Sequence, residues 1–322
     1  MNRRNMVLAA LGALPPVAHS QPARRIPVIG FMSPGSPETS VVWAALRDGL
    51  REQGYVDGES VKIEARWAQG KPDALPRFAQ ELLALKVDVL VAVARPSVLA
   101  AKQATATLPI VAFDLEAAPI ASGFAASLGR PGGNLTGLFL DHPQIAGKWL
   151  QLLREVVPGA LRIAVLWDVS TGDAQVRAIT AAAKALSVEL TLLELRDAGE
   201  MQSVLESGLK GRPQALVLLG SPLFSQRAQT IAEFCATNRL PAISPFRSFA
   251  QSGGLMSYGV NFALTLRQLA PYVVKILNGA KPGDLAIEQP SHFEFVVNQK
   301  AAKALGLSIA QSVLVRADEV IR

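Results

Sequence analysis

The sequence predicts an α/β fold of two similar lobes, each with a parallel sheet flanked by helices. First, the nearly continuous apolar, β-branched run Val87–Val93 is typical of a strand covered on both faces in a parallel sheet. Second, a helical pattern follows each strand pattern. Third, the pattern around this strand recurs later in the chain, around Gln214–Leu219. A series of strands and helices that occurs twice in one chain predicts two lobes, with a small ligand in the cleft between them.

The first lobe is expected to alternate strands and helices from residue 28 onward. Its strands are predicted at Val28–Phe31, Val61–Arg66, Val87–Val93 and Leu108–Leu115. In the first helix the apolar residues between Val42 and Leu50 fall on one face, and Gly54 is suited to end it. After a loop rich in glycine and proline, Leu135–Leu140 is predicted to be a strand that leads toward the second lobe.

The second lobe is expected to repeat this order. Its strands are predicted at Ile163–Trp167, Val188–Leu195, Gln214–Leu219 and Leu240–Ile243. Between the last two, a single helix is expected over Leu223–Asn238. Pro222 in the second unit matches Pro96 in the first, which supports the repeat.

The elements after the repeats are expected to cross between the lobes more than once. Strands are predicted at Gly253–Tyr258 and Phe293–Val297, and a helix at Gln299–Leu305. A long helix from Phe262 to Leu277 contains Pro271, which should kink it, because proline removes a backbone hydrogen bond and clashes with the preceding turn.

The N-terminus predicts a signal peptide over residues 1–20. Arg3 and Arg4 precede a short apolar segment and a small-x-small cleavage site at Ala18–Ser20. The apolar segment is too short for a membrane anchor, which needs about 20 apolar residues. Cys235, the single cysteine, lies far from that site, so we expect a periplasmic protein that is not a lipoprotein.

The composition argues against nucleic-acid binding and against catalysis. The net charge of +6 is spread along the chain without a basic cluster interleaved with aromatics. After the predicted leader only His142 and His292 remain, and no G-x-S-x-G elbow, phosphate loop or metal-ligand spacing occurs. We therefore expect no nucleic-acid partner, no cofactor, no metal and no catalytic residue; an α/β enzyme is the less favoured alternative.

Several segments resemble one protein family along essentially the whole chain after the leader. These segments are Leu50–Gly58, Arg66–Ala68, Arg130–Gly137, Gly253–Gly259 and Ala304–Leu307. They look like the ABC transporter substrate-binding proteins of the tryptophan/tyrosine-binding type. The resemblance implies a type 1 periplasmic binding fold, in which two Rossmann-like lobes are joined by a hinge of three crossovers. On this basis we place the N-terminal lobe at 26–140 plus 260–288 and the C-terminal lobe at 141–259 plus 289–322.

The function implied by this resemblance is solute capture for an ABC importer. A small polar or amino-acid-like molecule would be trapped between the lobes by hinge closure, and the closed form would dock on an ABC permease in the inner membrane. We expect a monomer. A periplasmic ligand sensor that presents its closed form to a membrane receptor is the alternative.

The candidate ligand contacts lie at strand ends and turns that should face the cleft. The Arg95 guanidinium can grip a carboxylate, or instead form an ion pair with Asp114 or Glu116. Asp114 and Asp168 can receive an ammonium group, or act only as turn residues. Phe246 and Tyr258 can supply an apolar wall or a hydroxyl, whereas Trp67 is expected to pack within its lobe. The turn residues that can bind an anionic group, or merely cap helices, are Ser33, Gly35, Ser36, Ser97 and Ser221.

Overall fold

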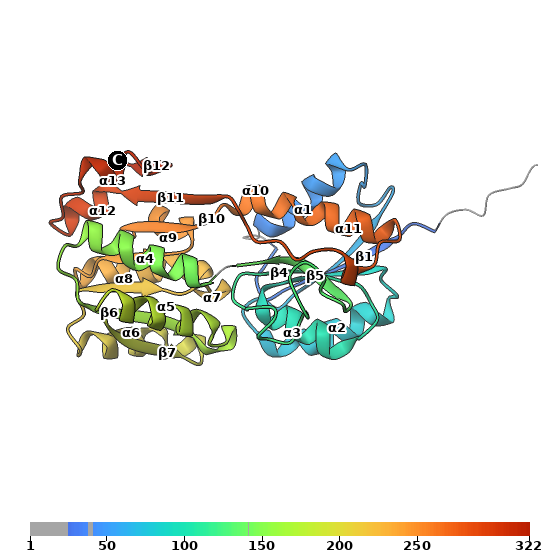
Figure 1. The fold of residues 1–322 in the computed structure, drawn as a ribbon, viewed down its shortest axis with the longest axis horizontal. Coiled ribbons are helices and arrows are strands. Elements are labelled where there is room, and N and C mark those ends of the chain that lie inside the picture. Colours follow the sequence, from blue (N-terminus) through green and yellow to red (C-terminus); the bar gives the residue numbers. More distant parts are fainter. Residues whose placement is uncertain (1–24, 38–40, 141) are drawn as a thin grey trace, which may run out of the picture.

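Two separate sheets organise the chain in the computed structural model, which describes residues 25–37, 41–140 and 142–322. One sheet has five strands in the order β2-β1-β3-β4-β5, and the other has seven in the order β12-β11-β10-β9-β8-β6-β7. Each sheet carries helices on both faces, and the two bodies lie side by side (Figure 1). We call the body around the first sheet lobe 1 and the other lobe 2. The predicted fold class, two Rossmann-like lobes with parallel sheets, is confirmed.

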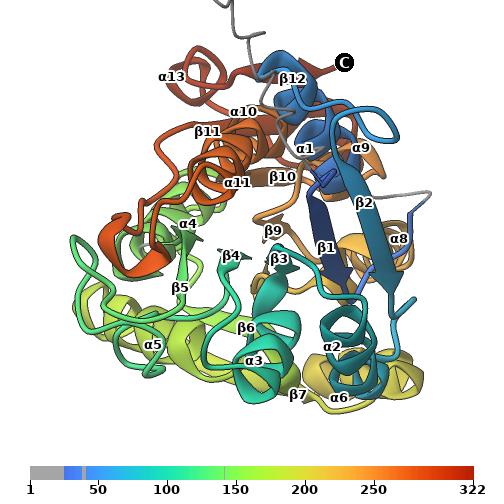
Figure 2. The same cartoon turned by 90° about the vertical axis from the view of Figure 1, so that its right-hand side faces the viewer.

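Lobe 1 is built around β3, in which all five residues are buried. Alternate residues of its strands face two helical layers: Val89 and Val91 pack with α1 and α11, whereas Leu90 and Ala92 pack with α2 and α3 (Figure 2). Its strands are β1 (Val28–Ser33), β2 (Lys62–Trp67), β3 (Val89–Val93), β4 (Ile110–Asp114) and β5 (Leu135–Phe139). Its helices are α1 (Val41–Glu52), α2 (Leu75–Ala84), α3 (Ala94–Ala104), α10 (Phe262–Arg267) and α11 (Leu269–Leu277).

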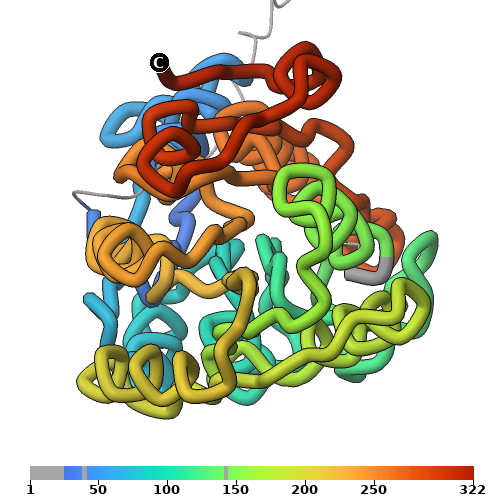
Figure 3. The backbone as a smooth tube through the Cα atoms, turned by 90° about the vertical axis from the view of Figure 1, so that its left-hand side faces the viewer, coloured from blue at the N-terminus to red at the C-terminus, as the bar shows by residue number. Residues whose placement is uncertain are grey.

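Lobe 2 has the same design with additional strands, and β12 and β7 form its two edges. Its strands are β6 (Arg162–Asp168), β7 (Glu189–Leu195), β8 (Ala215–Leu218), β9 (Ala242–Ser244), β10 (Met256–Val260), β11 (Phe293–Asn298) and β12 (Glu319–Ile321). Its helices are α4 (His142–Val156), α5 (Ala174–Ala185), α6 (Met201–Leu209), α7 (Pro222–Gln226), α8 (Ala228–Thr237), α9 (Arg247–Gln251), α12 (Gln299–Ala304) and α13 (Gln311–Leu314). The C-terminal segment lies at the β12 edge, the red end of this lobe in Figure 3.

The internal repeat read from the sequence is visible in the strand order. Read from its β2 edge, the first sheet has the order β2-β1-β3-β4-β5, and read from its β7 edge, the second sheet begins β7-β6-β8-β9-β10. In both sheets the second strand of the lobe therefore lies at the edge, followed by the first, third, fourth and fifth strands. Two details differ from the prediction. The helix expected over Leu223–Asn238 is two helices, α7 and α8, which meet at Arg227. β11 runs antiparallel to β10, unlike the other strand pairs that the structure describes.

The chain passes between the sheets three times: after β5, after β10 and before β11 (Figure 1). The helix that follows the second passage breaks at Gln268, between α10 and α11, three residues before Pro271. This break agrees with the predicted kink. The domain boundaries at residues 140, 260 and 288 stay a prediction, and the predicted signal peptide lies outside the described residues.

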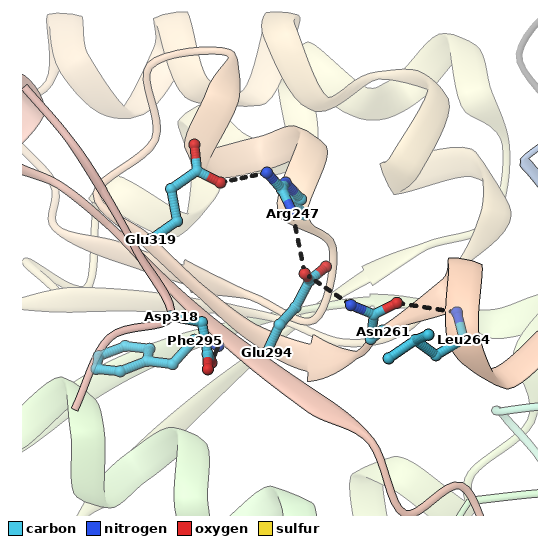
Figure 4. A network of polar contacts seen from close by, with 7 residues as sticks. All are labelled: Arg247, Asn261, Leu264, Glu294, Phe295, Asp318 and Glu319. Carbon is cyan, nitrogen blue, oxygen red and sulfur yellow. Dashed lines mark hydrogen bonds and ion pairs between the residues drawn. The ribbon is translucent and has the colours of Figure 1, made fainter.

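A polar network joins the second and third passages (Figure 4). Asn261 caps α10, since its Oδ1 accepts a hydrogen bond from the Leu264 N–H at 3.0 Å. The Asn261 Nδ2 donates to Glu294 Oε2 at 3.3 Å, and Arg247 binds the same carboxylate at 3.2 Å. Arg247 also forms an ion pair with Glu319 of β12. The start of a lobe 1 helix is thus bonded to the sheet of lobe 2.

Cys235 is buried in the core beneath α8, and burial raises the pKa of its thiol to about 12, as expected for a core thiol. Within the described ranges, no helix is long and apolar enough to cross a membrane.

Gly147→Ala is expected to raise the free energy of unfolding by about 0.5–1 kcal/mol. Gly147 lies inside α4, and an added Cβ would meet no atom within 4 Å, so alanine gains helix propensity without a clash. Urea unfolding followed by circular dichroism measures the change. A decrease in stability would show that α4 is not a regular helix at this position.

Candidate ligand-binding site

Six of the predicted residues lie where strands of the two sheets end. In lobe 1, Ser33 ends β1, Arg95 follows β3 and Asp114 ends β4. In lobe 2, Asp168 ends β6, while Ser221 and Phe246 come just before α7 and α9. Because neighbouring parallel strands end at the same edge, each set is gathered at one edge of its sheet.

The two edges meet each other. The N-terminal part of α3 packs against the short helix η2 (Val169–Thr171), which directly follows Asp168. The Arg95 side chain lies against Gly172, since a Cβ on that glycine would be 2.8 Å from the Arg95 Cζ. On the other side, the Gln226 side chain of α7 lies close to Gly35, 3.7 Å from a Cβ built there. Predicted residues of lobe 1 therefore face lobe 2 directly.

Arg95 is oriented by an unusual turn. Ala94 has a φ of +64°, in the left-handed region that residues other than glycine seldom adopt. This turn directs the Arg95 N–H to Glu116 Oε2, at 3.0 Å. Among the described residues the guanidinium forms no ion pair, so the predicted alternative of a salt bridge to Asp114 or Glu116 is replaced by this backbone contact.

Asp114 and Glu116 form a buried carboxyl pair. Asp114 Oδ1 accepts hydrogen bonds from the N–H groups of Glu116 and Ala117, at 2.9 and 2.8 Å. Its Oδ2 is buried and has no hydrogen-bond partner among the residues that the structure describes. Burial raises the pKa of Asp114, although these N–H groups and Arg95 oppose the shift. Burial, followed by the charge of Asp114, raises the pKa of Glu116 well above its usual value.

Asp168 and Ser221 are bonded to each other in lobe 2. The Ser221 hydroxyl donates to Asp168 Oδ2 at 2.6 Å and accepts the Leu223 N–H, so it also caps α7. Asp168 Oδ1 accepts the Ser170 N–H at 2.9 Å. Both residues therefore have the structural role that the sequence left as an alternative, and both lie at the edge that faces lobe 1.

The remaining turn residues differ in their surroundings. The Ser33 hydroxyl accepts the Gly35 N–H at 3.2 Å, which closes the turn after β1, and Ser36 next to it is half-buried. Ser97 is fully buried in the first turn of α3, and within the described part of the chain its hydroxyl has no hydrogen-bond partner. An unpartnered buried hydroxyl is costly to the fold, and the role of Ser97 as a ligand contact stays a prediction.

The two predicted aromatic residues lie in different places. Phe246 packs on Phe262 at 5.9 Å between ring centroids, and Phe262 packs on Phe113 of β4 at 5.7 Å. This row of rings spans the two lobes. Tyr258 instead stacks on Phe293 and packs, partly buried, against the core beneath α4. It shares that face with Met256 and Val260, and the structure does not bring it together with the other site residues.

Beside these contacts lies an apolar groove of about 480 Å³. Its lining includes Ala118, two residues after Glu116, and Ala174, two residues after Gly172. None of the ten predicted residues lines it. Its lining comes from the loop after β4, from α5 and from two passages between the lobes, and includes Ala118, Ile120, Leu128, Leu140, Ala178 and Gln289.

Sequence reasoning missed several residues that shape this region. Glu116 was considered only as a partner of Arg95, although a second acid two residues after a strand-ending aspartate was a readable signal. Gln175 is buried and ties α5 to the turn after β8 through two hydrogen bonds with Gly220, at 2.6 and 2.8 Å. Phe262 belongs to the apolar pattern that predicts a core helix. That pattern does not show that Phe262 also contacts the other lobe.

Comparison with known proteins shows where this architecture recurs. The sequence model of the family described as "ABC transporter substrate binding protein" matches residues 25–321. A tyrosine-binding protein of Clostridioides difficile is 26% identical over 260 residues, which cover 80% of this chain and 74% of that protein.

Two solved structures are also similar. The complex of an ABC domain from Streptococcus pneumoniae with L-Trp is 25% identical, with a TM-score of 0.85 over 92% of this chain and 99% of that one. The ligand-free, open structure of a substrate-binding protein with adhesive properties from Clostridium difficile is 24% identical, with a TM-score of 0.67 over the same shares.

Proposed function

Because the chain belongs to the family of ABC transporter substrate-binding proteins, and so is a binding component rather than an enzyme, we propose that it captures an amino-acid-like solute between its two lobes. The main support for this proposal is that the strand-end edges of the two lobes are in contact, with Arg95 of lobe 1 against Gly172 of lobe 2. Ligands of open α/β sheets bind outside the carboxyl ends of the strands, and here two such edges face each other.

Hinge closure is the mechanism that we propose for capture. A ligand that contacts both edges favours the closed arrangement by its differential affinity for that state. Two observations support this. The lobes already touch at the site, and the TM-score is higher with the L-Trp complex than with the open, ligand-free structure. We place the hinge at the three passages, with lobe boundaries near residues 140, 260 and 288.

An amino acid fits the groups that converge at this place. Arg95 can bind a carboxylate, the Asp114 carboxyl lies at the same edge, and the apolar groove next to them can receive a side chain. The names of two relatives, a tyrosine-binding protein and a complex with L-Trp, support this solute class. We propose that the mature protein is a periplasmic monomer that acts after removal of residues 1–20 and delivers its solute to an inner-membrane permease.

Titration with L-tyrosine and L-tryptophan tests the proposed function. Calorimetry should detect saturable binding of at least one of them, and small-angle scattering should show a decrease in the radius of gyration on binding. If neither amino acid binds, the proposed solute class is contradicted. Binding without any change in scattering would contradict closure.

Arg95→Ala is expected to weaken binding of the amino acid by about 10- to 100-fold, because a charge-assisted contact to a carboxylate contributes about 1.5–3 kcal/mol. Calorimetry with the same two amino acids measures the change. Arg196→Ala is the matched control, since Arg196 lies on the surface of lobe 2 and pairs with Glu194. Unchanged affinity in Arg95→Ala would remove Arg95 from the site.

A further inference from the structure

The carboxyl pair of Asp114 and Glu116 is under-satisfied for two acids at such depth. Asp114 is fully buried and Glu116 is 4% exposed. Asp114 Oδ1 accepts two backbone N–H groups, and no N–H group of the described residues donates to Oδ2, so only a proton shared with the Glu116 side chain could satisfy it. Two carboxylates buried beside a single counter-charge are unstable, so a pair of this kind either holds a proton or receives a cation.

The charged groups around the pair come from both lobes. On α3, the Arg95 backbone N–H donates to Glu116 and the Arg95 guanidinium acts on Asp114. From lobe 2, the carboxylate of Asp168 acts on Glu116, and both Asp168 oxygens already accept hydrogen bonds. The carboxyl groups of Asp114, Glu116 and Asp168 and the guanidinium of Arg95 therefore act on one another where the lobes touch. Because these acids outnumber the guanidinium, a further positive charge would be favoured there.

We propose that the Asp114–Glu116 pair is a proton-exchange subsite, in which the ammonium group of the ligand replaces a proton that the pair holds in the empty protein. The inference rests on the proposed function. One proton leaves the pair for solvent as the –NH₃⁺ group enters, and Asp114 Oδ2 becomes the free acceptor for an N–H of that group. Ligands of this protein are accordingly amines, and a carboxylate alone does not suffice.

Burial agrees with this assignment. It raises the pKa of both acids, and it raises that of Glu116 further above the usual value because Asp114 lies beside it. Glu116 is therefore the residue that we expect to carry the proton. A bound ammonium group favours the ionised pair and so lowers its pKa. Below the raised pKa the dissociation constant then falls with increasing pH, by up to about tenfold per unit, and levels off above it.

Calorimetry of L-tyrosine in two buffers of different ionisation enthalpy counts the protons. We expect release of up to about one proton per ligand below the raised pKa. Two probes separate the two ends of the ligand: tyramine, which lacks the carboxylate, and 3-(4-hydroxyphenyl)propionate, which lacks the amine. Tyramine should still release the proton. The propionate should bind much more weakly and without proton release.

Glu116→Gln keeps the acceptor for the Arg95 N–H and removes the proton. We expect about tenfold weaker binding of L-tyrosine, loss of proton release and a pH-independent dissociation constant. Glu189→Gln, at an exposed position on β7, is the control and should retain all three properties.

The possible outcomes are distinct. Binding of L-tyrosine without proton release at any pH, or equal binding of the propionate, overturns the proton-exchange subsite and leaves the proposed function standing. Absence of binding by all three probes and by L-tryptophan contradicts the proposed solute class and the subsite with it. If Glu116→Gln does not fold, the buffer series on the unmodified protein decides.

Discussion

Replacing Gly259 by alanine is expected to lower the free energy of unfolding by about 3–5 kcal/mol. Gly259 lies in β10, and a Cβ there would stand 1.9 Å from the carbonyl oxygen of Pro245. That atom belongs to the backbone, so the clash can be relieved only by moving the segment after β9. Phe246 follows directly and would lose its contact with Phe262, so ligand affinity should fall as well. Urea unfolding and calorimetry with L-tyrosine measure both effects.

Ser257→Ala is the matched control in the same strand. Ser257 is 1% exposed and its hydroxyl has no hydrogen-bond partner in residues 25–37, 41–140 and 142–322, so its removal should be neutral or slightly stabilising. If Gly259→Ala is no more destabilising than Ser257→Ala, the close approach of Pro245 to β10 is not a feature of the folded protein.

Trp149→Ala is expected to cost about 4 kcal/mol of stability. Trp149 is the largest fully buried side chain that the structure describes, at 1% exposure. It lies on α4 and donates through Nε1 to the carbonyl oxygen of Tyr258, at 2.7 Å. Its removal leaves a cavity beneath α4 and an unpaired carbonyl in β10, close to the second passage.

Trp149→Phe separates these two contributions. The phenyl ring fills much of the cavity but cannot donate, so a loss of about 1–2 kcal/mol is expected. Both variants are compared by urea unfolding. An alanine variant as stable as the phenylalanine variant would mean that the packing of α4 on the sheet contributes little.

The sheets could be predicted because their inner strands carry an unmistakable pattern. A parallel strand buried on both faces, such as β3, is an unbroken apolar run that no surface element imitates. β12 gives no such signal, because it is short and follows the charged residues Asp318 and Glu319. It is recognisable as a strand only from the pairing of Val320 with Val297. The break between α7 and α8 at Arg227 likewise has no glycine or proline to announce it.

The positions of the site residues could be predicted better than their contacts. The rule that ligands gather at strand ends pointed to Arg95, Asp114 and Asp168, all of which lie at the facing edges. The partner of each depends on the other lobe or on a turn, as with the unusual φ of Ala94 that directs Arg95 to Glu116. The position of Tyr258 could have been predicted from the alternation of side chains along β10. Strand alternation puts it on the same face as Met256 and Val260, and therefore against the core.

The assignment of α10 and α11 to lobe 1 has a consequence for biosynthesis. Leu266, Leu269 and Val273 belong to the same core cluster as Phe31 and Leu46, although most of lobe 2 separates them along the chain. No nascent chain shorter than 277 residues contains all of lobe 1, so the ribosome must finish most of the polypeptide before this lobe can be completed. Such a late closing step would leave the apolar face of the lobe 1 sheet that α10 and α11 cover exposed for longer during synthesis.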